Sequence, residues 1–207
     1  ENNKESHVLL IVPASLLGNW SKEIDKFAPR MTYHILHGKT NILDEDCFAT
    51  ITTYGMALRN EYLQERVWDC LILDEAQAIK NPATKQTRAI KKIPSKMRIA
   101  MTGTPIENDL SNLWSLFDFL NKGLLGSATD FKNYTKKVQA YPEYITKLKM
   151  MVSPFILRRL KTDKSIISDL PDKMEITEHV DLSKRQIVLY RKEVEKAEDL
   201  ILESEGM

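Results

Sequence analysis

The sequence predicts an α/β fold, a parallel β-sheet with helices on both faces. Two observations carry this prediction. The first half of the 207-residue chain alternates short apolar runs with longer amphipathic segments. The runs are also strand-sized and almost continuously apolar, which is typical of parallel strands that are buried on both faces. After Thr104 the alternation gives way to mainly helical patterns.

The elements of the sheet follow in chain order. We expect five strands, at 7–13, 31–36, 47–53, 69–74 and 96–102. Apolar residues at helical spacing predict intervening helices at 16–27, 54–66 and 83–92. Ser15 precedes the first of these helices and is a candidate N-cap, and Pro29 ends it.

The second half of the chain has mainly helical patterns. Leucines and a phenylalanine form a stripe over 110–120, which Gly123 and Gly126 end. Further helices are expected at 130–139 and 143–151, and an alternating strand at 174–182. From Ser183 onward, apolar residues repeat every three or four positions, which predicts a last amphipathic helix that needs a partner surface.

Composition indicates an ordinary globular protein, with 43% hydrophobic and 29% charged residues and a net charge of +1. No apolar run approaches the ~20 residues of a membrane span, so we expect no membrane partner. The two cysteines are expected to be reduced, and the four histidines lack metal-ligand spacing, so we predict no zinc. Seven basic and no acidic residues lie between Ala76 and Arg98, which fits either a solvated face or a flank that follows phosphates.

A carboxylate pair follows the fourth strand, in the stretch "LILDEAQAIKN" at 71–81. Ligands of parallel α/β sheets bind outside the carboxyl ends of the strands. Asp74 could hold Mg²⁺ through water, and Glu75 could polarise a water for attack on a γ-phosphate. Taken alone, the stretch could equally be a strand that ends in two solvated acids.

A second stretch, "RIAMTGTPIEN" at 98–108, also runs from an apolar strand into polar residues. Gly103 permits a tight turn there, and the hydroxyls of Thr102 and Thr104 could bridge to the carboxylates. Because both stretches occur in this order, each after an apolar strand, an ordinary strand-to-helix turn does not account for them.

Together these two stretches resemble motifs II and III of the Swi/Snf-type ATPases, the DNA-translocating branch of the superfamily two helicases. In the segment at 155–176, this chain is more similar to bacterial members of the family than to nuclear remodellers. The resemblance extends over nearly the whole chain: "LLIVPASLLGNWSKEIDKFAP" (9–29) is similar to motif Ia, "ATITTYGM" (49–56) to motif Ib, "LSNLWSLFDFLNKGLLGS" (110–127) to the helical protrusion, and "FILRRLKTDKSIISDLPDKMEI" (155–176) to the segment between the two RecA-like lobes.

The resemblance implies a role for each matching residue. Asp74 would be the magnesium carboxylate, Glu75 the catalytic base, and Gln77 would couple the γ-phosphate to the neighbouring lobe. Thr102, Gly103 and Thr104 would link the nucleotide state to the DNA surface. The residues at or near a DNA-facing rim would be Pro13, Ser15, Asn19, Thr52, Thr53 and Tyr54. Trp20 lies on the apolar face of its helix, so we expect it in the core.

The resemblance also implies ATP and Mg²⁺ as cofactors. The implied partners are double-stranded DNA, bound without sequence preference, and DNA-bound protein complexes. A P-loop, G-x-x-x-x-G-K-[ST], is nevertheless absent. Gly38-Lys39-Thr40 matches only its end, because Tyr33 stands at the first glycine position and "NILDED" follows. In the family the P-loop also precedes motif Ia. We therefore expect a fragment: part of a RecA-like lobe at 1–108 without its P-loop segment, a helical protrusion at 109–152, and a linker at 153–207 that ends in an amphipathic helix.

Loss of the P-loop strand is expected to expose sheet edges, with reduced stability, unusual strand pairing or self-association as consequences. For function, the first hypothesis is an ATP-dependent DNA translocase whose isolated fragment is inactive. The alternatives are a binding module without turnover and a degenerate scaffold, and the intact carboxylate pair argues against the scaffold. The location would be cytoplasmic and nucleoid-associated in a bacterium and nuclear in a eukaryote.

Overall fold

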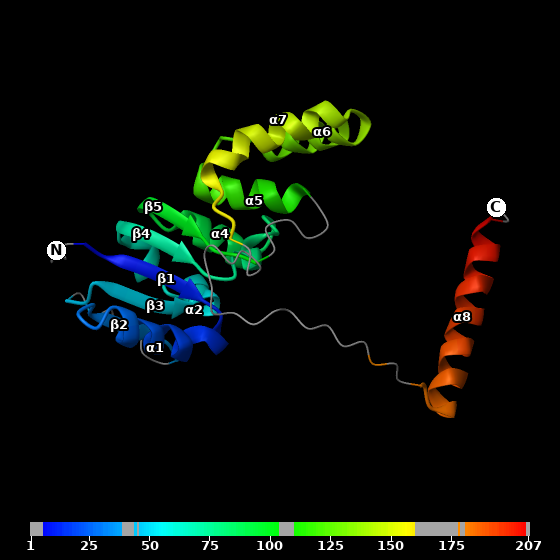
Figure 1. Cartoon of the computed structure of the whole chain (residues 1–207), viewed down its shortest axis with the longest axis horizontal. Helices are drawn as coiled ribbons and strands as arrows, with labels where there is room; N and C mark the ends of the chain where they lie inside the picture. Colours follow the sequence, from blue (N-terminus) through cyan, green and yellow to red (C-terminus); the bar gives the residue numbers. More distant parts are fainter. Residues whose placement is uncertain are drawn as a thin grey trace. The chain divides into compact units, whose positions relative to one another are not determined.

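The computed structural model describes residues 6–38, 44, 46–103, 110–159, 178 and 181–205 (Figure 1). The chain divides into two compact units, Glu1–Val152 and Ser153–Met207. The first unit holds the sheet and the expected helical protrusion together, so the boundary that we predict near residue 108 stays a prediction.

The sheet has five strands, all parallel, in the order β2-β3-β1-β4-β5. The strands are β1 (Val8–Val12), β2 (Tyr33–Leu36), β3 (Ala49–Thr53), β4 (Trp68–Leu73) and β5 (Ser95–Ala100). Every one lies within two residues of its predicted bounds, which confirms the predicted parallel α/β fold. The expectation of unusual pairing is wrong for these strands, because their ladders run in regular parallel register.

The helices of the first unit begin and end close to the predicted positions. They are α1 (Leu17–Phe27), α2 (Tyr54–Arg59), α3 (Tyr62–Glu65), α4 (Lys85–Lys92), α5 (Leu110–Leu120), α6 (Ala128–Ala140) and α7 (Pro142–Val152), with 3₁₀ turns η1 (Ala14–Leu16) and η2 (Ala76–Ile79). A further 3₁₀ turn, η3 (Ser153–Phe155), belongs to the second unit. The single helix predicted over 54–66 is wrong: the extended backbone of Asn60 separates α2 from α3. Ser15 is not the cap of α1 either, since it lies inside η1 and Leu16 takes the cap position.

The two faces of the sheet are covered unequally. On one face, side chains of β1 and β4 pack with those of α2, α4 and α5 in the largest apolar cluster. On the other face, α1 packs against β1 and β3 through a smaller cluster around Leu10 and Ile51. The parallel register aligns Leu10 with Ile72 and Ile72 with Ile99, so this face continues onto β5. Met97 and Ile99 of β5 are 54% and 39% exposed there, which agrees with the expected apolar surface at a sheet edge.

Helix α5 joins the sheet to the helical pair α6–α7. Leu116 and Phe119 belong to the cluster on the sheet, whereas Leu113 and Phe117 pack with α6 and α7. The spacing of these residues puts the two pairs on different sides of one helix. The helical region is therefore packed on the sheet through α5.

Polar contacts also hold α5 in place. The Lys91 ammonium donates to Asp118 Oδ2 at 2.8 Å, and its burial lowers the Lys91 pKa. The Ser115 hydroxyl donates to the carbonyl oxygen of Ile79 at 2.6 Å, and Arg98 Nη1 donates to that of Phe119 at 2.8 Å. Of the seven basic residues between Ala76 and Arg98, Lys91 and Arg98 thus hold α5 in place. These two therefore belong neither to a fully solvated face nor to a flank that follows phosphates.

The second unit consists of the segment from Ser153 and the helix α8 (Lys184–Glu205). The predicted last helix is confirmed, and its apolar Val188, Leu189 and Tyr190 are exposed. Most of the strand predicted at 174–182 lies outside the described residues. Both cysteines are free thiols, and none of the described helices is long and apolar enough to cross a membrane.

Candidate nucleotide site

The carboxylate pair lies at the carboxyl edge of the sheet, where β4 ends. Backbone hydrogen bonds continue past the strand: Asp74 N donates to Ile11 O at 2.9 Å, and Ala76 N donates to Met101 O at 2.9 Å. These bonds tie the segment after β4 to the chain of β1 on one side and to the segment after β5 on the other. The pair is therefore held by the sheet itself, in the position where α/β sheets bind ligands.

The Asp74 carboxylate is oriented by two donors. The indole N–H of Trp20 donates to Oδ2 at 2.8 Å, and the backbone N–H of Glu75 donates to Oδ1 at 2.9 Å. The carbonyl oxygen of Asp74 accepts from the Tyr54 hydroxyl at 2.6 Å. Trp20 and Tyr54 are 54 and 20 residues away in sequence, so the fold brings three separate motifs to one residue.

Trp20 is half-buried and packs against the cluster under α1, as the sequence predicts. Its contact with Asp74 was missed by sequence reasoning. A general rule does indicate that Trp20 has a polar partner, because a tryptophan that is packed in a core still needs an acceptor for its indole N–H. The pairing with Asp74 in particular could not be read from the helical stripe.

Glu75 has a left-handed backbone conformation, with φ 50° and ψ 51°. Among the described residues it is the one with positive φ that is not a glycine. Such a conformation costs of order 1 to 3 kcal/mol for a residue with a side chain and is concentrated at functional sites. Here it turns the chain from β4 directly into η2, and nothing in the local sequence indicates it.

Gln77 joins the two stretches that the sequence analysis singled out. Its Nε2 donates to Glu75 Oε2 at 2.5 Å, and its Oε1 accepts from the Thr102 hydroxyl at 2.7 Å. Glu75, Gln77 and Thr102 thus form a continuous hydrogen-bonded chain from the end of β4 to the end of β5. Thr104 lies outside the described residues, and among those described nothing lies within 4 Å of where a Cβ on Gly103 would stand. The coupling role of Thr102, Gly103 and Thr104 stays a prediction.

The residues expected on a DNA-facing rim fall into two groups. Ser15 and Asn19 are exposed and Pro13 is half-buried, so they remain available for contacts. Thr52, Thr53 and Tyr54 are buried, and each hydroxyl already has a partner within the protein. The Thr52 hydroxyl donates to Leu36 O, the Thr53 hydroxyl accepts from Met56 N, and the Tyr54 hydroxyl donates to Asp74 O. Their place at or near a DNA-facing rim stays a prediction.

The electrostatics of the site keep Tyr54 a hydrogen-bond donor. Burial raises its pKa, and the negative charges of Asp74 and Glu75 raise it further. Within the described part of the chain, no three His, Cys, Asp or Glu side chains cluster as a metal-binding group. One oriented carboxylate with free lone pairs suits Mg²⁺, which keeps several waters and is commonly held by one or two carboxylates together with substrate phosphates.

Comparison with known proteins tests the resemblance directly. The family model described as the SNF2-related domain matches residues 1–207. The chain belongs to the SNF2-related family. The SWI2/SNF2 ATPase core of Sulfolobus solfataricus, solved in complex with double-stranded DNA, is 45% identical with a TM-score of 0.75, over 94% of this chain and 42% of that one. The same core domain, solved as such, has a TM-score of 0.72.

Two curated relatives extend the comparison. YwqA of Bacillus subtilis, named as an ATP-dependent helicase/translocase, is 40% identical over 96% of this SNF2-related chain and 23% of its own length. The chromatin-remodeling ATPase INO80 of Saccharomyces cerevisiae is 34% identical over 88% of the chain and 14% of its own length. The chain therefore spans less than a quarter of either relative.

Proposed function

We propose that this SNF2-related chain is part of an ATP-dependent double-stranded DNA translocase, in which Asp74 and Glu75 serve ATP hydrolysis. The observation that carries the proposal is the hydrogen-bonded chain of Glu75, Gln77 and Thr102 beside the oriented carboxylate of Asp74. The named activities of YwqA and INO80, and the DNA in the Sulfolobus solfataricus complex, support it.

Asp74 would hold Mg²⁺ through water, and the ion would neutralise charge on the phosphates of ATP when both are bound. Trp20 and the Glu75 backbone keep the carboxylate in one orientation. Glu75 would orient a water molecule and accept its proton, since an ionised carboxylate accepts hydrogen bonds only. Because Gln77 forms hydrogen bonds with both Glu75 and Thr102, a change at the Glu75 carboxylate would move Gln77 and, through it, Thr102.

The DNA surface would include the exposed Ser15 and Asn19 near the start of α1, together with Pro13. Small polar side chains and backbone N–H groups at a helix start can contact phosphates without reading bases. Binding would therefore ignore sequence and weaken steeply as salt rises. Removal or repositioning of DNA-bound protein complexes would be the outcome of movement along DNA, in the nucleoid of a bacterium or the nucleus of a eukaryote.

Residues 1–207 contain no P-loop motif, so we propose that the isolated chain does not turn over ATP. It would act alone only as a binding module, and it could self-associate through the exposed edge of β5, where Met97 and Ile99 lie. The proposed organisation is a partial ATPase lobe at 1–108, a helical protrusion at 109–152 and a linker at 153–207.

The proposal is tested by measuring ATP hydrolysis by a longer protein that contains this chain and a P-loop, with and without duplex DNA. We expect magnesium-dependent hydrolysis that duplexes of unrelated sequence stimulate equally. Residues 1–207 alone serve as the control and should show no turnover. A longer protein that binds DNA but hydrolyses no ATP would contradict the translocase, and strong preference for one DNA sequence would contradict the mode of binding.

A further inference from the structure

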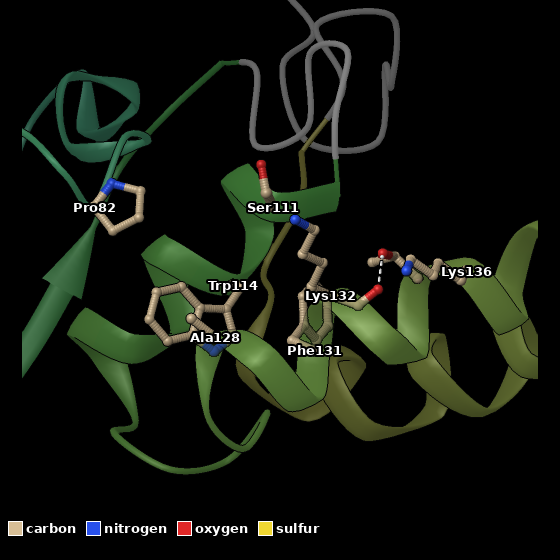
Figure 2. A pocket seen from close by; sticks show the side chains of 8 residues that line it. Pro82, Ser111, Trp114, Ala128, Phe131, Lys132 and Lys136 are labelled. Carbon is tan, nitrogen blue, oxygen red and sulfur yellow. Dashed lines mark hydrogen bonds between the residues drawn. The ribbon is translucent and has the colours of Figure 1, made fainter.

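A pocket of about 450 Å³ lies outside the candidate nucleotide site (Figure 2). None of Asp74, Glu75, Gln77 and Thr102 lines it. Among the described residues, three segments contribute: the turn after η2, the first half of α5 and one face of α6. The lining residues are Pro82, Ser111, Trp114, Ala128, Phe131, Lys132, Thr135 and Lys136.

The floor of the pocket is apolar and firmly held. Phe131 is buried in the cluster that joins α5, α6 and α7. The Trp114 indole N–H donates to Gly126 O at 3.0 Å, and the Lys91 ammonium lies 5.0 Å from the centre of the Trp114 ring. Because these contacts fix the indole from other sides, the floor is formed before any ligand arrives.

The rim of the pocket is positively charged. Lys132 and Lys136 are four residues apart on α6 and both are exposed, so they share one side of the helix (Figure 2). Within the described part of the chain, neither ammonium forms an ion pair. Asp130 is the one acid of α6, and it is already used in the capping box with Ser127, whose hydrogen bonds lower the Asp130 pKa. A ligand with negative charge would therefore meet two available ammonium groups.

We infer that this pocket docks an acidic peptide segment of a partner protein, with one large apolar side chain on the Trp114–Phe131 floor and carboxylates at Lys132 and Lys136. The volume lies within the ~300–1,000 Å³ typical of ligand pockets and accommodates a leucine or phenylalanine side chain. An apolar anchor in a preformed hollow supplies affinity, and the charges at the rim supply orientation and rate of association. Duplex DNA offers phosphates to the lysines but nothing to occupy the apolar floor.

Fluorescence polarisation with the full chain tests this inference. The probe is a short fluorescein-labelled peptide with a central phenylalanine flanked by glutamates. We expect saturable binding that weakens about fivefold or more in the double variant Lys132→Glu/Lys136→Glu, because two exposed charge pairs become repulsive. Lys147→Glu/Lys149→Glu is the matched control: it reverses two exposed charges on α7, outside the pocket, and should leave binding nearly unchanged.

Two further probes separate the alternatives. The same peptide with alanine at its centre should bind at least about fivefold more weakly, because the anchor leaves the floor. A labelled DNA duplex should bind Lys132→Glu/Lys136→Glu and Lys147→Glu/Lys149→Glu to the same extent. The inference is overturned if no peptide binds, if the alanine peptide binds equally well, or if Lys132→Glu/Lys136→Glu loses duplex binding while peptide binding persists.

Discussion

The carboxyl edge of the sheet and the helical region α5–α7 are held together in different ways. At the sheet edge, side-chain hydrogen bonds join residues 54, 20 and 25 positions apart: Trp20 with Asp74, Tyr54 with Asp74, and Gln77 with Thr102. Within the helical region, the side-chain bonds are shorter in range, such as Trp114 to Gly126 and Tyr134 to Tyr144, and an apolar cluster fixes the helices. Longer-range side-chain bonds, such as Ser115 to Ile79, join α5 to the rest of the unit.

Each region is therefore vulnerable to a different kind of substitution. The sheet edge depends on a few long-range polar contacts, and the loss of one should alter the site before it unfolds the unit. The helical region depends on volume and caps, so a cavity there should lower the free energy of unfolding without touching the site. Helix α5 belongs to both regions, which ties their stabilities together.

Removal of the Phe131 ring should lower the stability of the protein more than the other substitutions below. Phe131→Ala should lower the free energy of unfolding by about 3–5 kcal/mol, because it leaves a cavity in the cluster of α5, α6 and α7. Urea unfolding followed by circular dichroism measures this loss. Because α5 packs on both regions, a single transition is expected. A separate early transition of the helical region would show that the two regions unfold independently.

The loss of an indole N–H can be compared at Trp20 and Trp114, each of which donates one hydrogen bond through this group. Trp20→Phe removes a donor to a carboxylate and should cost about 1.5–3 kcal/mol, whereas Trp114→Phe removes a donor to a neutral carbonyl and should cost about 0.5–1.5 kcal/mol. Chemical unfolding gives both numbers. In the longer protein, Trp20→Phe should also raise the Mg²⁺ concentration that is needed for half-maximal ATP hydrolysis, and Trp114→Phe should leave that concentration unchanged. Equal behaviour of the two variants would remove the distinction between the regions.

A smaller effect is expected at the cap of α6. Ser127 accepts from the backbone N–H of Asp130 and completes a capping box. Ser127→Ala should lower the free energy of unfolding by about 1 kcal/mol, and Ser127→Thr, which keeps the hydroxyl, should restore most of it. Thermal unfolding of the three proteins measures the difference. If alanine and serine were equivalent, the cap would contribute nothing to the helical region.

The smallest effect depends on pH. The Lys96 ammonium and the backbone N–H of His7 hold the pKa of Asp69 below its ordinary value. Because the folded pKa is depressed, the stabilisation is present above the unfolded pKa of about 3.9 and is lost as pH falls through the folded value. Asp69→Asn should therefore be slightly less stable than the wild type at neutral pH and equally stable in strong acid. A difference that persists in acid would have another cause.

The sequence predicts the sheet well because its strands are apolar throughout and buried on both faces, so periodicity and burial agree. It also brings Asp74, Glu75 and Thr102 to one edge, because parallel strands share their carboxyl ends. It does not predict that Trp20 bonds Asp74, that Tyr54 faces inward, or that Glu75 is left-handed. These features depend on contacts between residues distant in sequence, which no local pattern records.

In the proposed site, Glu75 is the base that accepts a proton during ATP hydrolysis. Glu75→Gln keeps the size of the side chain and one acceptor oxygen but cannot take up a proton. In the longer protein, we predict that it lowers DNA-stimulated ATP hydrolysis at least about 100-fold, while binding of a labelled ATP analogue stays within about twofold because the phosphates and magnesium are held by other groups. Hydrolysis near the wild-type rate in Glu75→Gln would contradict the account.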